Sequence, residues 1–420
     1  MFLIISVIAA IIGAFISLHP VLIFDDGLTS EELSKAKVMM ILLTISMILG
    51  FMSTVFNCFI YANQKFIFTK SLNVFTTVIN VVLNLFVLFL GYGAIGLIIV
   101  SLILSIITKI ITIIYAYKSL NFKFDFKHVE TRLFKSVLAF SGLIAINMFV
   151  DKVNSGIDSI LLGRFCGTAA VAVYSVGASL NSHFSMFSTA ISGVFTPHIH
   201  NLVNSYEMDS LEQRNALTKF FVKVGRLQYL LLALIASGVV FFGKQFIHFW
   251  AGEGYEKSYY IALILILPSI ISLTQNVGIE IQRAENRHHY RAYIYGAMAL
   301  LNLTLSIFLC QIWEGIGAAI GTGLASLVAN GIIMDVVYHK KININILEYW
   351  KNILHQTLGM IGPFIIGALI MKFADMGSLV KLAFWIFVYV IIYAVFVWLV
   401  SMNKFEKELF LGAIKKLKRH

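Results

Sequence analysis

The feature that most constrains this chain is a series of long apolar runs, each close to the length needed to cross a bilayer. A spanning helix needs about 20 mostly apolar residues. Lipid offers no partner to exposed backbone groups, and the runs are too long for barrel strands, so we predict helices. The sequence therefore predicts an all-α polytopic membrane protein with about twelve transmembrane helices. The predicted spans are 1–24, 38–61, 72–92, 94–117, 136–163, 168–196, 220–249, 258–282, 292–313, 316–338, 356–373 and 379–401.

The composition agrees with a chain that has almost no soluble domain. Hydrophobic residues make up 59% of the 420 residues, charged residues make up 13%, and the mean hydropathy is +0.87. The net charge of +11 does not by itself indicate nucleic acid, because excess Lys and Arg in a membrane protein gather in cytoplasmic loops. Cys58, Cys166 and Cys310 lie far apart without CxxC spacing, so we expect neither a disulfide framework nor a metal site.

The orientation follows from the Lys and Arg residues in alternate loops. Twenty-two fall in one set of loops, which includes the tail after residue 402, and seven fall in the opposite set. The positive-inside rule places the richer set, and with it both termini, in the cytoplasm. The basic tail 415–420 is expected to anchor the topology near anionic headgroups.

An internal repeat relates the two halves of the chain. A shift of 222 residues superposes the spans of 220–338 on those of 1–117 within about two residues, and Asn80 then coincides with Asn302. Parallel repeats of this kind are common in transporters, with the substrate path between the halves.

The repeat unit of the second half begins with the helices 136–163 and 168–196, which have no counterpart in the first half. We expect a truncated or mis-started reading frame, or a loss in this family member. We favour about 85 further N-terminal residues carrying two more helices. The predicted domains are 1–117 (an incomplete lobe), 118–135 (a connector), 136–338 (a six-helix lobe), 356–401 (a helix pair) and 402–420 (a basic tail).

Charges inside the spans are few, and the span 136–163 stands out because it combines charges with other polar residues. Its polar residues recur at helical spacing along one face, and polar residues inside a bilayer are usually paired or face water. One interpretation is an Asp–Lys pair that satisfies itself between helices. We favour the other, the wall of a water-filled cavity, because the stripe exceeds what one pair requires. The stripe comprises Asn147, Asp151, Asn154 and Asp158, with Lys152 beside it and Arg164 at the outer end.

Three further positions extend the set of cavity candidates. Asn181 and His183 lie beside a row of hydroxyl residues in 168–196, a row that either lines a cavity or helps helices pack. Lys109 lies deep in its span and is the better candidate to face an anionic substrate. Arg226 is expected to extend toward the headgroups.

Several catalytic signatures are absent from the sequence. It contains no GxxxxGK[ST] phosphate loop, no HExxH and no cluster of Cys and His ligands. No loop between the predicted spans is long enough to fold as a catalytic domain. We therefore predict no cofactor, no metal and no enzymatic activity.

The stretch FSGLIAINMFVDKVNSGIDSILLGRFCGTAAVAVYSVGASL resembles the start of the second half of polysaccharide (O-antigen type) flippases, in the multidrug/oligosaccharidyl-lipid/polysaccharide exporter superfamily. Asp158, Gly163, Phe165, Gly167 and Tyr174 carry the likeness, together with the turns GYGAIG (91–96) and WEGIGAAIG (313–321). The family implies two six-helix lobes around a central cationic cavity, plus two C-terminal helices. The missing first pair departs from that fourteen-helix pattern.

The resemblance implies a function in surface polysaccharide synthesis at the bacterial cytoplasmic membrane. The implied activity moves an undecaprenyl-diphosphate-linked oligosaccharide to the outer leaflet. The implied partners are this substrate and membrane lipids, and no nucleic acid. Two further kinds of partner are left open: H+ or Na+ as a coupling ion, and polymerase and chain-length proteins. Two alternatives remain: a cation-coupled drug antiporter using Asp151 and Asp158, and a membrane polysaccharide polymerase.

Overall fold

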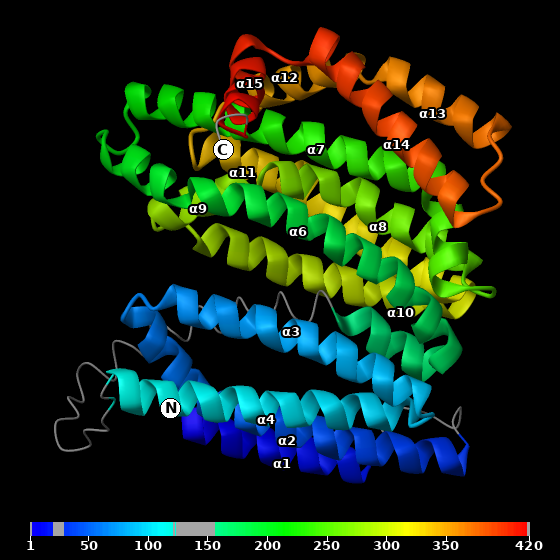
Figure 1. Cartoon of the computed structure of the whole chain (residues 1–420). Coiled ribbons are helices and arrows are strands. Elements are labelled where there is room, and N and C mark those ends of the chain that lie inside the picture. Colours follow the sequence, from blue (N-terminus) through cyan, green and yellow to red (C-terminus); the bar gives the residue numbers. More distant parts are fainter. Residues whose placement is uncertain (1, 20–28, 121, 123–155, 418–420) are drawn as a thin grey trace. The chain divides into compact units, whose positions relative to one another are not determined.

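The computed structural model describes residues 2–19, 29–120, 122 and 156–417 (Figure 1). Every regular element within these ranges is a helix, which confirms the predicted all-α class. The chain divides into two compact units, Met1–Gly142 and Leu143–His420, and each is considered by itself.

Unit 1 contains four helices formed by the first four apolar runs. α2 packs against α1 and α4, and α3 packs against α4. A capping box fixes the start of α2: the Thr29 hydroxyl accepts from the Glu32 N–H, and the Glu32 carboxylate accepts from the Thr29 N–H. The helices are α1 (Phe2–Leu18), α2 (Ser30–Ala62), α3 (Phe66–Phe89) and α4 (Gly93–Leu120).

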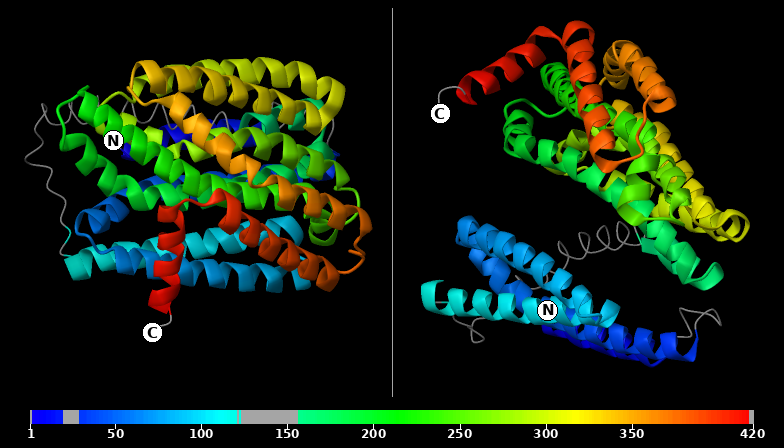
Figure 2. Two further views of the ribbon diagram at one scale, coloured as in Figure 1. Left: turned by 90° about the horizontal axis from the view of Figure 1, so that it is seen from above. Right: turned by 45° about the vertical axis from the view of Figure 1, so that its right-hand side comes forward.

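Unit 2 is a larger bundle in which α8 contacts α6, α7 and α10, while α12, α13 and α14 pack against α7. A helical stretch over residues 156–165 precedes α6. The last helix, α15, lies across the direction of the others (Figure 2). The elements are α6 (Thr168–Asn204), α7 (Leu211–Ala251), α8 (Glu256–Thr274), α9 (Asn276–Ala284), α10 (His289–Ser326), the π-helical η2 (Leu327–Ile333), α11 (Met334–Lys340), α12 (Ile346–Leu358), α13 (Ile361–Phe373), α14 (Leu379–Phe396), the π-helical η3 (Val397–Ser401) and α15 (Lys404–Leu417).

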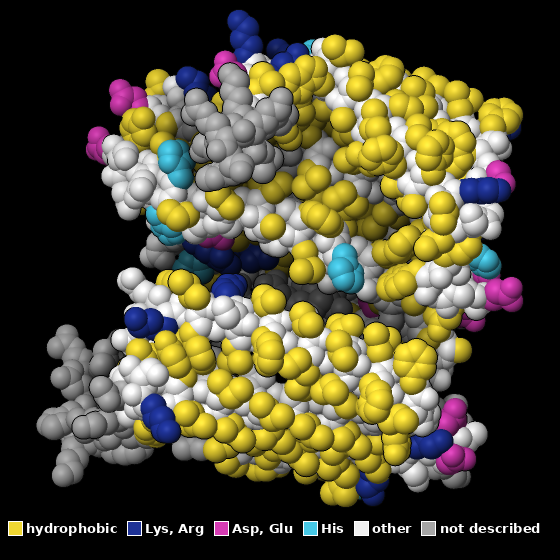
Figure 3. Space-filling view, viewed as in Figure 1, with side chains coloured by type: hydrophobic (Ala, Val, Ile, Leu, Met, Phe, Trp, Pro, Cys, Tyr) yellow, Lys and Arg dark blue, Asp and Glu magenta, His cyan; other side chains and the backbone are white. Residues whose placement is uncertain are grey.

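Large apolar side chains cover the sides of both units, and charged side chains gather near the helix ends (Figure 3). Such a surface suits a hydrocarbon solvent, since it exposes far more apolar area than a soluble protein tolerates. In the described ranges, seven helical stretches are long and apolar enough to cross a membrane, or eight if the bent pair α12–α13 counts as one span. The chain is therefore a polytopic membrane protein, as predicted.

The seven stretches account for eight of the predicted spans, because the stretch His289–Lys340 contains two helices joined by a kink, which match 292–313 and 316–338. The stretch is interrupted at Trp313 and Glu314, and Glu314 has φ 51° and ψ −131°. The bent pair α12–α13 covers 356–373. α1 is shorter than its predicted span, and α6 is long enough to cross a membrane but less apolar than the seven stretches. Most of the predicted span 136–163 lies outside the described residues.

Two predicted spans contain breaks that the apolar pattern does not reveal. The span 258–282 is divided at Thr274 and Gln275 into α8 and α9. α12 begins at Ile346, before the predicted start at residue 356, and bends by 46° into α13. α12 was missed because it is amphipathic, with Tyr349 and Ile353 buried against α7 and polar residues on its other side.

The backbone reproduces the 222-residue repeat. Gln64 and Asn286, which are 222 residues apart, both adopt the left-handed conformation, with φ of 57° and 56°. The helices that precede them end at Ala62 and Ala284, again 222 residues apart. Because non-glycine residues rarely adopt positive φ, two such residues at equivalent positions support the repeat.

Candidate functional site

The structure describes only part of the predicted polar stripe. Asn147, Asp151, Lys152 and Asn154 lie outside the described residues, so their exposure to a cavity stays a prediction. Asp158 and Arg164 belong to the helical stretch 156–165, where Asp158 is buried and Arg164 is exposed.

Asp158 lies at the centre of a cluster of oxygen atoms contributed by three helical segments of unit 2. Its Oδ2 accepts hydrogen bonds from Tyr174 Oη on α6 and Thr322 Oγ1 on α10, both at 2.5 Å. Its Oδ1 accepts from Ser306 Oγ at 3.0 Å. The hydroxyls of Ser306 and Thr322 also lie 3.0 Å from Oδ1 of Asn302. Asp158 is thereby held by three hydroxyl donors in the interior of the bundle.

No Lys or Arg of the described residues forms an ion pair with Asp158. A buried carboxylate without a counter-charge is costly unless it takes up a proton or a cation. The cluster presents carboxylate, amide and hydroxyl oxygens, which suit hard cations and protons rather than transition metals. The cluster is therefore suited to hold a proton or a small monovalent cation.

Close packing of glycines on α10 holds this cluster together. A Cβ on Gly321 would lie 2.6 Å from Ser306 Oγ and 2.9 Å from Ser306 N. A Cβ on Gly317 would lie 1.9 Å from the carbonyl oxygen of Leu309. The two arms of α10, on either side of the break at Trp313 and Glu314, can approach this closely only without side chains at these positions.

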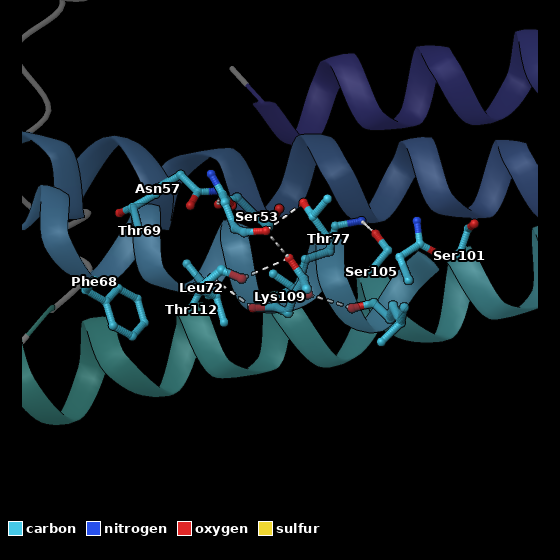
Figure 4. A pocket seen from close by; sticks show the side chains of 15 residues that line it. Ser53, Asn57, Phe68, Thr69, Leu72, Thr77, Ser101, Ser105, Lys109 and Thr112 are labelled. Atoms are coloured by element: carbon cyan, nitrogen blue, oxygen red, sulfur yellow. Dashed lines mark hydrogen bonds between the residues drawn. The ribbon is translucent and has the colours of Figure 1, made fainter. Parts of the chain in front are cut away.

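A second polar site lies in unit 1, where α2, α3 and α4 line an open pocket of about 300 Å³ (Figure 4). Its walls are mostly hydroxyl and amide side chains, although the helices are apolar overall. Lys109 of α4 is the only cationic residue that lines it within the described part of the chain. The pocket is lined by Ser53, Asn57, Phe68, Thr69, Leu72, Asn73, Thr76, Thr77, Asn80, Ser101, Leu104, Ser105, Thr108, Lys109 and Thr112.

Lys109 is held by neutral groups in this pocket. Its Nζ donates to Ser105 Oγ at 2.7 Å and to the carbonyl oxygen of Ser46 at 3.2 Å. No carboxylate of the described residues pairs with it. Thr108 and Thr112 donate to carbonyl oxygens of their own helix, so their hydroxyls can still accept. The site combines a positive charge, which no described carboxylate compensates, with a hydrogen-bonding wall, as an anionic, hydroxyl-rich ligand requires.

Part of the hydroxyl row of α6 makes hydrogen bonds between packed helices. Ser188 is buried and donates to the carbonyl oxygen of Leu273, and Gln228 and Asn276 both donate to its hydroxyl. Asn181 accepts a hydrogen bond from Ser269 at 3.3 Å. His183 is exposed, and its Nδ1 lies 2.7 Å from the carbonyl oxygen of Ser179 on the same helix. Asn181 and His183 are thus separate from the Asp158 cluster.

Arg226 corrects one expectation, because it does not extend toward the headgroups. Its side chain is buried and forms a bidentate ion pair with Glu406 of α15, at 2.7 Å from Nε and 3.0 Å from Nη2. Nη2 also donates to the carbonyl oxygen of Ser401 at 3.0 Å. The partner lies 180 residues away, and no local pattern in the sequence could indicate it.

The sequence indicated Asp158 and Lys109 but not the residues around them. Tyr174 was singled out only through the family resemblance, and Asn302 only as the partner of Asn80 in the repeat. No sequence pattern indicated Thr322. For Ser306 the only indication was its position four residues after Asn302, which places these two side chains on one face of a helix. Most of the pocket around Lys109 was missed because single Ser, Thr and Asn residues are common in transmembrane helices.

Comparison with known proteins gives both a family and a fold. No curated protein matches the chain. The solved structure titled "Lipid II flippase MurJ, inward closed conformation" has a similar fold, with a TM-score of 0.73 and 17% sequence identity over 98% of this chain and 82% of that chain. A model of the polysaccharide biosynthesis protein family matches residues 3–259, more than half of the sequence. The chain therefore belongs to the polysaccharide biosynthesis protein family.

Proposed function

We propose that the protein is a flippase, which moves a diphosphate-linked oligosaccharide lipid from the cytoplasmic to the outer leaflet of the bacterial cytoplasmic membrane. The observation that carries the proposal is the polar pocket that membrane-spanning helices line around the cationic side chain of Lys109. The family match and the fold shared with a structure titled as a lipid II flippase support it.

The pocket offers what such a substrate requires. Lys109 would compensate part of the diphosphate charge, and the hydroxyl and amide side chains of α2, α3 and α4 would bind sugar hydroxyls. The polyprenyl tail would remain in the bilayer, where the apolar sides of the helices are in contact with lipid. Movement between leaflets needs no covalent step, so the proposed activity is transport rather than enzymatic catalysis.

The Asp158 cluster is the proposed site of the coupling ion. A proton or Na+ bound there would neutralise the buried carboxylate and change the hydrogen bonds that join the stretch 156–165 to α6 and α10. An ion that binds one conformation better than another shifts their populations by its differential affinity. Such a shift would drive alternating access of the polar path.

Polymerase and chain-length proteins are proposed partners downstream of the transported lipid, and both termini are proposed to be cytoplasmic. The family match does not favour a drug antiporter or a polymerase. The polar stripe Asn147, Asp151, Lys152 and Asn154, together with Arg164, Asn181 and His183, remains proposed as further lining of the substrate path.

Flipping in proteoliposomes tests the proposal, with a fluorescent undecaprenyl-diphosphate-linked oligosaccharide as the probe. Lys109→Ala should reduce flipping at least tenfold, whereas Lys109→Arg should retain most of it, because only the charge is required at that position. Lys118→Ala, at the exposed end of the same helix, is the matched control and should be unaffected. Equal rates for Lys109→Ala and the unchanged protein would contradict the proposed anion site.

The coupling ion is tested by imposing a pH gradient or a Na+ gradient separately. One of the two should accelerate flipping, and Asp158→Asn should abolish the acceleration, since an amide cannot bind the ion as a charged carboxylate does. Flipping that responds to neither gradient would overturn the assignment of the Asp158 cluster, while leaving the Lys109 site intact.

A further inference from the structure

The last described helix, α15, differs from the other helices of unit 2 in its direction and in the residues on its surface. The chain leaves η3 through Met402, whose ψ of 133° ends the helix, and α15 then runs across the direction of the long helices of unit 2 (Figure 2). Because those helices cross the membrane, α15 lies along the membrane plane rather than through it.

The first turn of α15 is fixed to the bundle. Glu406 is buried and paired with Arg226 of α7, and its carboxylate also accepts from the N–H of Asn403 at 2.9 Å. Lys223 lies about one turn before Arg226 on α7. Its Nζ lies 3.6 Å from the centre of the Phe405 ring. The start of α15 is therefore held at a defined height relative to α7.

Beyond this turn, α15 exposes an apolar face that no described residue covers. Leu409 and Phe410 are 44% and 42% exposed. They follow Glu406 by three and four residues, so helical spacing places them on the side of α15 that faces the bundle at its first turn. Immediately before α15, Leu399 and Val400 of η3 are 69% and 57% exposed. The open face of α15 therefore continues from a surface that contacts lipid.

Basic residues flank that apolar face. Six of the residues 404–420 are Lys or Arg, and two are Glu. The negative charge of one of them, Glu406, is balanced by its ion pair with Arg226. Lys404 lies on the opposite side of the helix from Glu406, and Lys407 lies at the margin between the two sides. Amphipathic helices of this kind bind in the plane of membranes with anionic lipids.

We propose that α15 docks on the cytoplasmic leaflet by inserting its apolar face among acyl chains while its lysines bind anionic phospholipid headgroups. The proposal goes beyond transport itself and rests only on the cytoplasmic orientation proposed above. A basic residue near an anionic surface gains attraction that falls off within a Debye length, so docking is sensitive to lipid charge and to salt. Through Glu406 and Arg226, the docked helix is tied to α7.

The test uses the full chain with its three cysteines replaced by Ala and with Gly412→Cys, an exposed position with open space around it. A polarity-sensitive fluorophore on that cysteine reports whether α15 is docked. In vesicles of phosphatidylcholine with phosphatidylglycerol, emission should shift to the blue relative to phosphatidylcholine alone. High salt should reverse the shift.

Variants of the lysines and of Phe410 separate the electrostatic contribution to docking from the apolar contribution. Each Lys→Gln change among Lys404, Lys407, Lys415 and Lys416 should lower the ratio of docked to free helix about fivefold. Phe410→Ser should lower it in both kinds of vesicle. Lys340→Gln with Lys341→Gln, which removes two cationic side chains outside α15, is the matched control and should leave the shift unchanged.

Emission that is the same in both kinds of vesicle would overturn the proposal, and so would an equal loss in the control variant. The inactive Lys109→Ala protein should keep the full shift, because docking does not depend on flipping. Failure of α15 docking and failure of the proposed transport are thereby distinguishable. If an acidic protein rather than lipid occupied this face, the vesicle-dependent shift would be absent.

Discussion

Two buried charges illustrate how single residues are accommodated in this protein. Asp158 is held by hydroxyl groups and has no ion-pair partner among the described residues, whereas Arg226 has a bidentate carboxylate partner and main-chain acceptors. The first arrangement is poised to bind a proton or cation, and the second is complete in itself. Their environments therefore support the proposed functional role of Asp158 and a structural role of Arg226.

Arg226→Gln should destabilise the protein strongly. It leaves Glu406 as an unpaired buried charge, which costs about 3–5 kcal/mol. Thermal unfolding in detergent should show a large drop in the transition temperature. The double variant Arg226→Met with Glu406→Leu should recover most of the loss, because two apolar side chains fill the space without any charge. A loss below about 1 kcal/mol for Arg226→Gln would contradict the observed pairing.

Glu285, in the loop between α9 and α10, makes stability depend on pH. Burial raises the pKa of its carboxyl from 4.5 to about 7, although nearby Arg287 opposes the shift. The folded protein therefore favours neutral Glu285, while the unfolded chain ionises it at lower pH. The free energy of unfolding should be highest below pH 4.5 for this group and should fall by up to about 3 kcal/mol as pH rises through 7.

The measurement is the unfolding temperature in detergent between about pH 5 and pH 8. Glu285→Gln should flatten the profile, because the amide does not titrate. Asp209 does not confound this range: hydrogen bonding to Arg287 lowers the pKa of Asp209, so its contribution is lost only as the pH falls below its ordinary value. An unchanged slope in Glu285→Gln would assign the dependence to another group.

At the scale of elements, the sequence predicted helices more reliably than their interruptions. Apolar length alone defines a membrane helix, so α2, α3, α4 and α7 follow directly from their runs. The break between α8 and α9 depends on contacts made at a distance. Tyr349 of α12 donates a hydrogen bond to Thr274 Oγ1 at 2.7 Å. A pattern of apolar residues carries no information about such a partner.

Gly321→Ala should impair transport by disturbing one element. The new methyl group would displace Ser306, whose hydroxyl donates to Asp158, from its position against the other arm of α10. Overpacking of this kind costs about 1–3 kcal/mol. Flipping should fall more than protein level, because the displaced group belongs to the proposed ion site.

Gly296→Ala is the matched control for this change. Gly296 lies on the same helix and has nothing within 4 Å of an added Cβ, so alanine there should leave flipping unchanged. If both variants behaved alike, the effect would reflect helix propensity rather than the close approach at Ser306.

At the scale of the molecule, the repeat was visible in the sequence because both halves keep the same spacing of helices. The left-handed residues Gln64 and Asn286 follow that spacing in the structure. The polar groups of the two proposed sites follow the repeat only in part: Asn302 contributes to the Asp158 cluster, while Asn80 lines the pocket of Lys109. One architecture thus carries two different polar sites, and which side chains complete each site depends on contacts between helices that are distant in sequence.

Contacts between loops at each end of unit 2 allow the predicted topology to be tested. Arg287 Nη2 lies 2.6 Å from Asp209 Oδ2, and Asn343 Nδ2 lies 2.7 Å from Asp209 Oδ1. These contacts hold the loops after α6, α9 and α11 at one end of the unit. At the other end, one pocket is lined by both Gly252 and Gly377. The positive-inside bias predicts that the first end is cytoplasmic.

Reporter fusions at Glu212, His288 and Asn345 should therefore all score cytoplasmic, and fusions at Glu253 and Gly377 should both score external. Because the loops at each end touch one another, the reports within each group cannot differ while the fold is intact. A uniform inversion of both groups would keep the fold but reverse the orientation, and would remove α15 from the cytoplasmic leaflet. A split within either group would contradict the helix arrangement itself.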